Sequence, residues 1–298
     1  MLQAYCVAGH TFHLDLPDGS PVLPLLSQYK GFVTDPVDDP LFILRVVEEI
    51  PEREKEPLYV VEPEDEGQPR LDLYSCADGV LVEMAPIAKL PVCARLLASK
   101  DYRRGELAFL RDSLQSSVFA VNNSLMLLFA FCSAPYKTLE MHASVILNGG
   151  KGYLFLGRSG TGKSTHSSLW LKHIEGSELM NDDNPVLRVG DDGVTRVYGS
   201  PWSGKTPCYR NISAPVGAIV RIHQAKHNTI TRQNVIESYA SVYSSCSGFK
   251  ADRGMADGQH ETLEHIALNV PCYVLDCLPD EEAARVCAAE VRKEGGDA

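Results

Sequence analysis

The distribution of apolar and polar residues divides the chain into a strand-rich first part and a second part in which strands and helices alternate. In the first part, short β-rich segments at residues 58–62, 71–75 and 79–85 are separated by Pro, Asp and Gly. This pattern favours short antiparallel strands joined by turns. We therefore expect residues 1–115 to form a small, mainly antiparallel β-rich domain with one or two short helices. No motif in it indicates chemistry.

The second part, residues 116–298, begins with a long apolar segment. Residues 117–132, SVFAVNNSLMLLFAFC, have the length of a helix and are apolar on most sides, which predicts a buried connecting helix. Strands and helices then alternate, so the order of elements predicts a mixed α/β or α+β fold. We expect a strand, an Asn-Gly-Gly turn and a strand over residues 141–157, further strands at 216–222 and 271–277, and helices at 164–174, 235–243 and from 279 onward.

The composition of the chain limits where the protein is expected to be located and which partners it is expected to bind. The 298 residues are 44% hydrophobic and 22% charged, as in ordinary globular proteins. The net charge, 28 − 39 = −11, argues against a general nucleic-acid binder, which needs a basic face. The start lacks a basic segment followed by an apolar core, and the most apolar run, residues 125–132, is far shorter than the about 20 residues of a membrane helix. Nine cysteines without CxxC pairs indicate reduced thiols. We expect a cytoplasmic protein that contacts neither membrane nor nucleic acid.

A glycine-rich loop, GRSGTGKST at residues 157–165, carries the clearest chemical signal. It satisfies G-x-x-x-x-G-K-[ST], in which glycines let backbone N–H groups turn toward phosphate oxygens. Lys163 would reach the β and γ phosphates, and the Ser164 hydroxyl would bind Mg²⁺. An apolar strand precedes the motif and an amphipathic helix follows it, which favours nucleotide binding over a chance match. The residues assigned to ATP are Gly157, Ser159, Gly160, Thr161, Gly162, Lys163, Ser164 and Thr165.

Two adjacent carboxylates, Asp182 and Asp183, follow Lys163 by about twenty residues. Neighbouring carboxylates need a cation or a shared proton if both are buried. One could bind the Mg²⁺ held by Ser164, and the other could accept a proton from a hydroxyl group or water. The alternative is a solvated turn, since Asn-Asp-Asp-Asn is a good turn sequence. The loop upstream favours the functional interpretation.

Two further features are ambiguous by themselves. His142 lies on the strand that enters the first hairpin, where a histidine is more often a core or surface residue than a catalyst. Residues 199–211, GSPWSGKTPCYRN, form a Gly- and Pro-rich loop that carries Lys205 and Arg210. Such a loop could close over a negatively charged substrate, or it could be a plain surface connection. Both interpretations of this loop stay open.

Together these residues resemble the superfamily of HPr kinase/phosphorylase and ATP-dependent phosphoenolpyruvate carboxykinase, in particular an uncharacterised bacterial branch related to HPr kinase. The matching pieces are MHASVI, GRSGTGKST and NDD, within about residues 140–225. The resemblance implies a P-loop nucleotide-binding domain on a mixed sheet, and a tendency to form homo-oligomers. It also implies that His142 lies near the γ-phosphate and that Lys163 holds the phosphates. We assign Asp182 as the base, with Ser164 and Asp183 toward Mg²⁺.

Two departures from the superfamily bear on the substrate. The Glu-x-Arg-Gly signature of HPr kinases is missing, so HPr itself is not implied, and the chain is too short for the decarboxylating relatives. We expect an ATP–Mg²⁺-dependent phosphotransferase that moves the γ-phosphoryl group to a hydroxyl of a small molecule or a protein serine, with Lys205 or Arg210 near the acceptor. A non-catalytic ATP-binding regulatory module and an NTP hydrolase are the alternatives.

Overall fold

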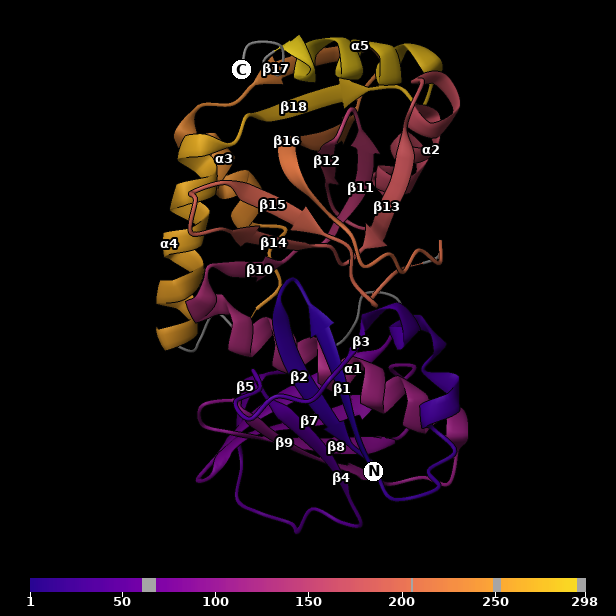
Figure 1. Ribbon diagram of the computed structural model, residues 1–298, viewed down its shortest axis with the longest axis vertical. Helices are drawn as coiled ribbons and strands as arrows, with labels where there is room; N and C mark the ends of the chain where they lie inside the picture. Colours follow the sequence, from indigo (N-terminus) through magenta and orange to yellow (C-terminus); the bar gives the residue numbers. More distant parts are fainter. Residues whose placement is uncertain (61–67, 205, 249–252, 294–298) are drawn as a thin grey trace. The chain divides into compact units, whose positions relative to one another are not determined.

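The computed structural model describes residues 1–60, 68–204, 206–248 and 253–293. The chain divides into two compact units, Met1–Ser133 and Ala134–Ala298, and each contains one large mixed sheet (Figure 1). The structure is therefore mixed α/β, as the order of apolar segments predicts. The division falls after Ser133, whereas the sequence led us to expect it at residue 115.

The first unit is built on a nine-stranded sheet with the order β3-β1-β2-β4-β9-β8-β7-β6-β5. Its strand pairs are antiparallel except β2–β4 and β4–β9. Two short 3₁₀-helices, η1 (Leu23–Leu25) and η2 (Ser27–Phe32), precede β3. The strands are β1 (Leu2–Val7), β2 (His10–Asp15), β3 (Val33–Thr34), β4 (Ile43–Val47), β5 (Glu56–Tyr59), β6 (Arg70–Cys76), β7 (Gly79–Ala85), β8 (Ala94–Ser99) and β9 (Arg104–Phe109).

Helix α1 (Leu114–Ser133) belongs to this first unit because it packs on β8 and β9. Phe129 meets Phe12 edge to face, with ring centroids 6.1 Å apart. A Cβ atom at Gly105 of β9 would lie 2.7 Å from Leu128 Cδ1, so the missing side chain lets the helix approach closely. This packing explains why the division lies after α1. By length and composition α1 could cross a membrane, but 67% of its most apolar window is buried, as in a core helix.

The second unit contains the strand order β10-β14-β15-β16-β12-β11-β13, with β18 paired to β16 and β17 paired to β18. The long strand β16 joins the two parts of this sheet, because its first residues pair with β15 and its later residues lie parallel to β12 and β18. The strands are β10 (Thr138–Glu140), β11 (Ala143–Asn148), β12 (Lys151–Leu156), β13 (Glu178–Asp183), β14 (Val186–Val189), β15 (Thr195–Tyr198), β16 (Ser213–Gln224), β17 (Thr229–Arg232) and β18 (Cys272–Cys277).

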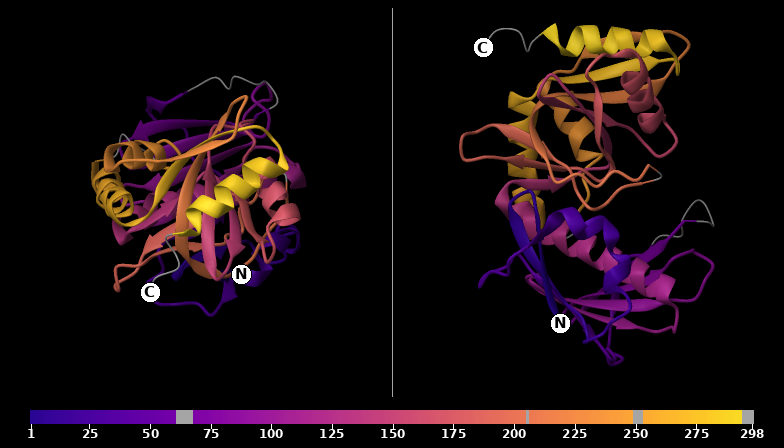
Figure 2. Two further views of the ribbon diagram at one scale, coloured as in Figure 1. Left: turned by 90° about the horizontal axis from the view of Figure 1, so that it is seen from above. Right: turned by 45° about the vertical axis from the view of Figure 1, so that its right-hand side comes forward.

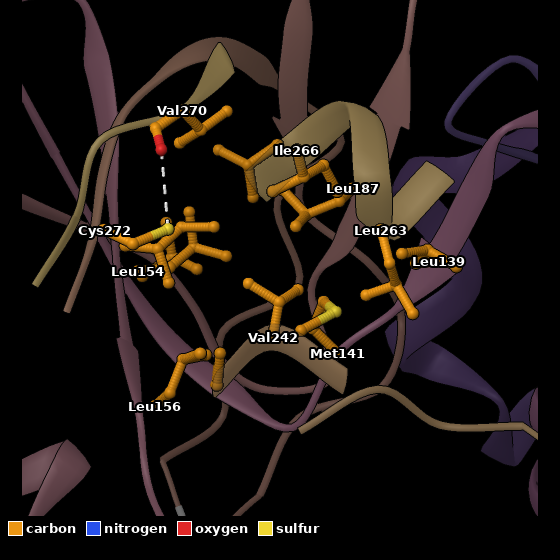
Figure 3. Packing of buried hydrophobic residues seen from close by; sticks show 14 of the residues in the cluster. Leu139, Met141, Leu154, Leu156, Leu187, Val242, Leu263, Ile266, Val270 and Cys272 are labelled. Carbon is orange, nitrogen blue, oxygen red and sulfur yellow. Dashed lines mark hydrogen bonds between the residues drawn. The ribbon is translucent and has the colours of Figure 1, made fainter. Parts of the chain in front are cut away.

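Helices cover both faces of the sheet in the second unit. Tyr153 and Phe155 of β12 pack in the cluster that includes α2 (Lys163–His173) and α5 (Glu281–Val291). Leu154 and Leu156 pack in the opposite cluster, with α3 (Val235–Tyr243) and α4 (Arg253–Asn269) (Figure 3). Figures 1 and 2 show α5, in yellow, along the side of β18 away from α4. A strand buried on both faces reads as a continuous apolar run, which is why β12 was predictable.

The hairpin before the loop has the expected geometry. Asn148 of β11 is paired with Lys151 of β12, and the two linking glycines, Gly149 and Gly150, have φ values of +56° and +75°. Positive φ at both central residues is what a tight two-residue hairpin turn needs. Because β12, β16 and β18 are parallel neighbours, the segments that follow their carboxyl ends meet at one edge of the sheet. The glycine-rich loop is one of these segments.

Candidate functional site

The loop between β12 and α2 has a backbone that requires glycine. Gly157, Gly160 and Gly162 have φ values of +153°, +80° and +104°. A Cβ atom at Gly157 would lie only 2.4 Å from the Thr161 hydroxyl oxygen. Gly162 is the N-cap of α2 and provides no side-chain cap for the first N–H groups of the helix. Free N–H groups at a helix N-terminus are suited to bind an anion such as phosphate.

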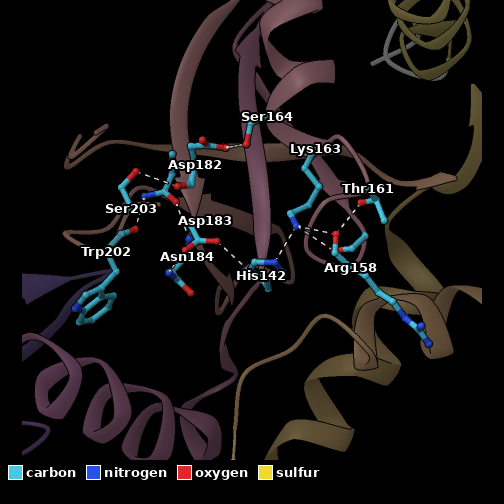
Figure 4. A network of polar contacts seen from close by, with 12 residues as sticks. His142, Arg158, Thr161, Lys163, Ser164, Asp182, Asp183, Asn184, Trp202 and Ser203 are labelled. Atoms are coloured by element: carbon cyan, nitrogen blue, oxygen red, sulfur yellow. Dashed lines mark hydrogen bonds and ion pairs between the residues drawn. The ribbon is translucent and has the colours of Figure 1, made fainter. Parts of the chain in front are cut away.

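Lys163 lies at the centre of a chain of polar contacts. Its ammonium donates to the carbonyl of Gly157 at 3.0 Å and lies 2.8 Å from Nε2 of His142 (Figure 4). An ammonium group can only donate, so Nε2 accepts and the proton of a neutral His142 is on Nδ1. Nδ1 lies 3.0 Å from Oδ1 of Asp183 and donates to it. Burial lowers the pKa of Lys163, and the charges of Asp183 and Asp182 partly oppose that change.

The two aspartates reach the loop in different ways. Asp182, which is 4% exposed, accepts a hydrogen bond of 3.0 Å from the Ser164 hydroxyl through Oδ1. Asp183 contacts His142 through Oδ1 and accepts from the side-chain amide of Asn184 at 3.2 Å through Oδ2. Neighbouring residues of a regular strand point to opposite faces. Asp183 has a φ of +134°, which breaks the regular strand at its last residue.

Residues 200–204 support the backbone behind the two aspartates. Ser203 Oγ and the Gly204 N–H both donate to the carbonyl of Asp182, at 2.9 and 2.6 Å. Asn181 donates to the carbonyl of the buried Trp202 at 3.1 Å. The start of the Pro-Trp loop therefore holds the end of β13 in place. Strained backbone of this kind persists where the surroundings determine it fully, and it is concentrated at functional sites.

The strain at Asp183 has a testable consequence for stability. We expect Asp183→Gly to unfold at a higher urea concentration than Asp183→Ala, with a difference of about 1 kcal/mol, because glycine tolerates a positive φ and alanine does not. Both variants lack the carboxylate, so the comparison isolates the backbone. Equal stabilities would mean that the backbone at this position is not strained.

The structure does not bring Arg210 to the loop. Its guanidinium donates to the carbonyl of Leu179 and pairs with Glu178, each at 2.8 Å. Glu178 begins β13 and Asp183 ends it, so Arg210 is held at the far end of that strand. Lys205, the other cation expected near the acceptor, lies outside the described residues.

A different arginine, Arg221 on β16, faces the loop. Its guanidinium donates to the hydroxyls of Ser241 and Ser244, each at 2.6 Å, and of Ser245 at 3.1 Å. A cavity of about 580 Å³ is lined by Arg221, Ser244 and Ser245 together with His142 and with Arg158 of the loop. The sequence carried a signal for Arg221, because a charged residue interrupts the apolar run VGAIVRI. The pattern of that run predicts only a strand.

A second cavity, of about 390 Å³, also adjoins the loop. It is formed where β12, β16 and β18 end, by residues 160–162, 224–225 and 277–279, with Thr165 and Leu169 of α2. Gln224 donates to the carbonyl of Gly160 at 3.3 Å and so ties the end of β16 to the loop. The two cavities share Thr161 and Ile222; one extends to Thr165 and Leu169 and the other to His142 and Arg221.

The Ser164 hydroxyl and the Asp182 carboxylate are hard oxygen donors, which Mg²⁺ prefers. In the part of the chain that the structure describes, no cluster of three or more His, Cys, Asp or Glu side chains could hold a metal ion. Mg²⁺ is commonly bound by one or two protein oxygens together with substrate phosphates and water. The donors present therefore fit Mg²⁺ that arrives with a nucleotide.

Glu140 of β10 is a buried acid that the sequence did not single out. It is 2% exposed, and its Oε2 has no hydrogen-bond partner among the described residues. Burial raises the pKa of Glu140 well above its usual range, and the charge of Asp183 adds to the increase. A carboxyl group in such surroundings is kept in its neutral form.

We expect this acid to make the folded protein less stable as the pH rises. Above about pH 4.3 an unfolded glutamate releases the proton that folded Glu140 retains, so the free energy of unfolding falls by about 1.4 kcal/mol per pH unit until the folded pKa is reached. Glu140→Gln removes this dependence. Urea unfolding followed by tryptophan fluorescence reports the second unit, because Trp170 and Trp202 are the only two tryptophans. Parallel pH profiles for the two proteins would contradict the expectation.

Comparisons with known proteins leave the family open. No family model matches this sequence, and no curated protein matches it. Among solved structures, the Hpr(Ser) kinase/phosphatase from Coxiella burnetii is similar over 52% of this chain and 90% of that chain, with 12% sequence identity and a TM-score of 0.33. A similarity of this size decides nothing about function, which has to be inferred from the site itself.

Proposed function

We propose that this chain is an ATP- and Mg²⁺-dependent phosphotransferase that moves the γ-phosphoryl group to a hydroxyl acceptor. The observation that carries the proposal is the set of contacts around the loop. Lys163, His142 and Asp183 form one continuous chain, and Ser164 and Asp182 form a second pair beside it. We further propose that residues 134–298 form a P-loop nucleotide-binding domain of the HPr kinase and phosphoenolpyruvate carboxykinase type.

The two cavities suggest a direction for the nucleotide. In the G-x-x-x-x-G-K-[ST] motif, the lysine reaches the β and γ phosphates. The ammonium of Lys163 is directed to Gly157 and His142, so the γ-phosphate would lie at that end. The nucleoside would then occupy the partly apolar cavity beside Thr165 and Leu169. Apolar walls with a few polar groups are typical of such sites.

Ser164 and Asp182 would hold Mg²⁺ together with the phosphates. When bound, Mg²⁺ would neutralise negative charge on the phosphoryl oxygens. This assignment differs from our sequence-based one, which gave Asp182 the role of base and Asp183 the metal contact. The 3.0 Å contact between Ser164 and Asp182 favours the metal role for Asp182, because both side chains are then within reach of one cation.

His142 and Asp183 would together accept the proton of the acceptor hydroxyl. His142 lines the larger cavity, and its Nδ1 is fixed by Asp183. A carboxylate behind an imidazole fixes its tautomer and stabilises the imidazolium that forms. The loop amides and Lys163 would stabilise the charge on the transferred group.

The test uses the purified full-length chain with ATP and Mg²⁺. We expect saturable ATP binding and formation of ADP that increases when an acceptor from a panel of sugars, amino acids and hydroxy acids is added, with the phosphate recovered on that acceptor. Tight ATP binding without ADP formation, with any acceptor or with water, would instead support a non-catalytic regulatory module. Release of inorganic phosphate alone would support an NTP hydrolase.

A further inference from the structure

We propose that the acceptor is a small hydroxyl compound that carries a negative charge, as a carboxylate or a phosphate, and that Arg221 and Arg158 hold that charge in the larger cavity. The inference rests on the proposed function, because it names the second substrate of that reaction. It differs from the expectation for Arg210, which is held at the far end of β13, while the expectation for Lys205 stays a prediction.

Arg221 is a partly buried cation, and the groups that accept its hydrogen bonds are all neutral. Its guanidinium contacts serine hydroxyls, and within the described residues no carboxylate lies at ion-pair distance from it. Burial lowers the pKa of Arg221, and the charge of Arg158 lowers it further. A cation with a like charge nearby and no counter-charge is stabilised when an anion binds. A guanidinium also fits the two oxygens of a carboxylate or phosphate.

The charged side chains among the described residues that line the cavity are two cations, Arg158 and Arg221. His142, Arg158, Arg221 and His223 line it together with Ser244 and Ser245, and none of the described residues that line it is an Asp or a Glu. Arg158 is exposed, and Figure 4 shows its side chain extending away from the loop backbone. The two histidines each have an acidic neighbour: His142 lies 3.0 Å from Asp183, and His223 lies 3.5 Å from Asp276. In a chain of net charge −11 this local excess of cations favours an anionic ligand.

The size and position of the cavity favour a small molecule over a protein segment. Its volume of about 580 Å³ lies within the range of small-ligand sites, about 300–1,000 Å³. His142 lines the cavity and contacts Lys163, so a hydroxyl bound there would lie beside the γ end of the nucleotide. The hydroxyl oxygen would bond to the γ-phosphorus while the bond from that phosphorus to the β–γ bridging oxygen breaks. ADP leaves, and the proton goes to His142.

Binding to the protein saturated with ADP and Mg²⁺ tests this inference, because the loop is then filled. The probes are small hydroxy acids and hydroxyl phosphates, each matched with its neutral alcohol; glycerate and glycerol 3-phosphate against glycerol are the simplest set. We expect an anionic probe to bind more tightly than its neutral match. Comparing glycerate with glycerol 3-phosphate shows whether the site prefers a carboxylate or a phosphate. Equal binding of the neutral alcohols, or no binding of any anionic probe, would overturn the proposal.

Substitutions locate the anion. We expect Arg221→Gln to weaken binding of the anionic probe by about ten- to a hundredfold, which corresponds to the loss of a hydrogen bond to a charged group. Arg158→Gln serves as the second variant, since Arg221 also connects β16 to the end of α3 and its loss could disturb folding. Arg285→Gln on α5 is the matched control, because Arg285 pairs with Glu281 away from the cavity. Unchanged affinity in both Arg221→Gln and Arg158→Gln would overturn the proposal.

The two proposals fail in different ways. If ADP does not bind, but an anionic probe binds and Arg221→Gln weakens that binding, the phosphotransferase proposal is contradicted. The proposed anion site is then supported. If ADP binds, and ATP is converted to ADP only with neutral alcohols or with a protein serine, the proposal of an anionic acceptor is contradicted. The proposal of phosphoryl transfer is then supported.

Discussion

Asp183→Asn is expected to slow phosphoryl transfer by about 10²- to 10⁴-fold, the usual contribution of general base catalysis, while nucleotide affinity stays unchanged. An asparagine amide cannot stabilise the imidazolium of His142, and it can hold the ring in the wrong tautomer. ADP formation and ATP affinity, measured on the same preparation, separate the two effects.

Asp182→Asn is the matched comparison, because it makes the same chemical change at the neighbouring position. Through its contact with Ser164, Asp182 is expected to act on the metal, so this variant should need more Mg²⁺ to reach its maximal rate. Asp183→Asn should show the Mg²⁺ requirement of the unmodified protein. The reverse pattern would restore the assignment that the sequence first suggested, with Asp182 as the base.

Lys163→Met is expected to weaken binding of ATP–Mg²⁺ by about ten- to a hundredfold, because a charged hydrogen bond to the phosphates is lost. Methionine keeps most of the length of the side chain. Because Lys163 is only 9% exposed and burial lowers its pKa, removing the charge from this site should not destabilise the fold strongly. Equilibrium binding together with thermal unfolding separates lost affinity from lost structure. ATP affinity equal to that of the unmodified protein would show that the nucleotide does not bind at this loop.

Much of the second unit could be predicted from local patterns. Helix α3 (Val235–Tyr243) begins and ends where the sequence indicates, and Asn234 and Glu237 form a capping box at its start. The β11–β12 hairpin was predictable because its two glycines are required by the turn. These elements depend mainly on residues close in sequence.

Helix α4 (Arg253–Asn269) was not predicted, since Gly254 and Gly258 argue against a helix. Packing explains Gly258: a Cβ atom there would lie 2.8 Å from the carbonyl oxygen of Ala134. The sequence of α1 predicts a buried connecting helix, but it does not reveal that β8 and β9 are the strands that bury it. Contacts between residues distant in sequence decide both features: they allow a helix at Gly258, and they assign α1 to the first unit.

For the site, the sequence indicated the glycine-rich loop and the two aspartates. It did not indicate which side chain each aspartate contacts. Which aspartate meets Ser164 depends on the direction in which each side chain leaves the end of β13, and an Asp-Asp pair in a sequence carries no information about that direction. The larger cavity combines β16 with Ser244 and Ser245, which follow α3, so no continuous motif could mark it.

Single-turnover conversion of γ-labelled ATP, with protein in excess over nucleotide and Mg²⁺ present, tests phosphoryl transfer at this loop most directly. We expect the unmodified protein to convert bound ATP to ADP, Asp183→Asn to retain intact ATP, and Lys163→Met to retain little nucleotide. If the unmodified protein holds ATP unchanged with every acceptor and with water, or if Lys163→Met converts ATP as fast as the unmodified protein, this loop is not a site of phosphoryl transfer.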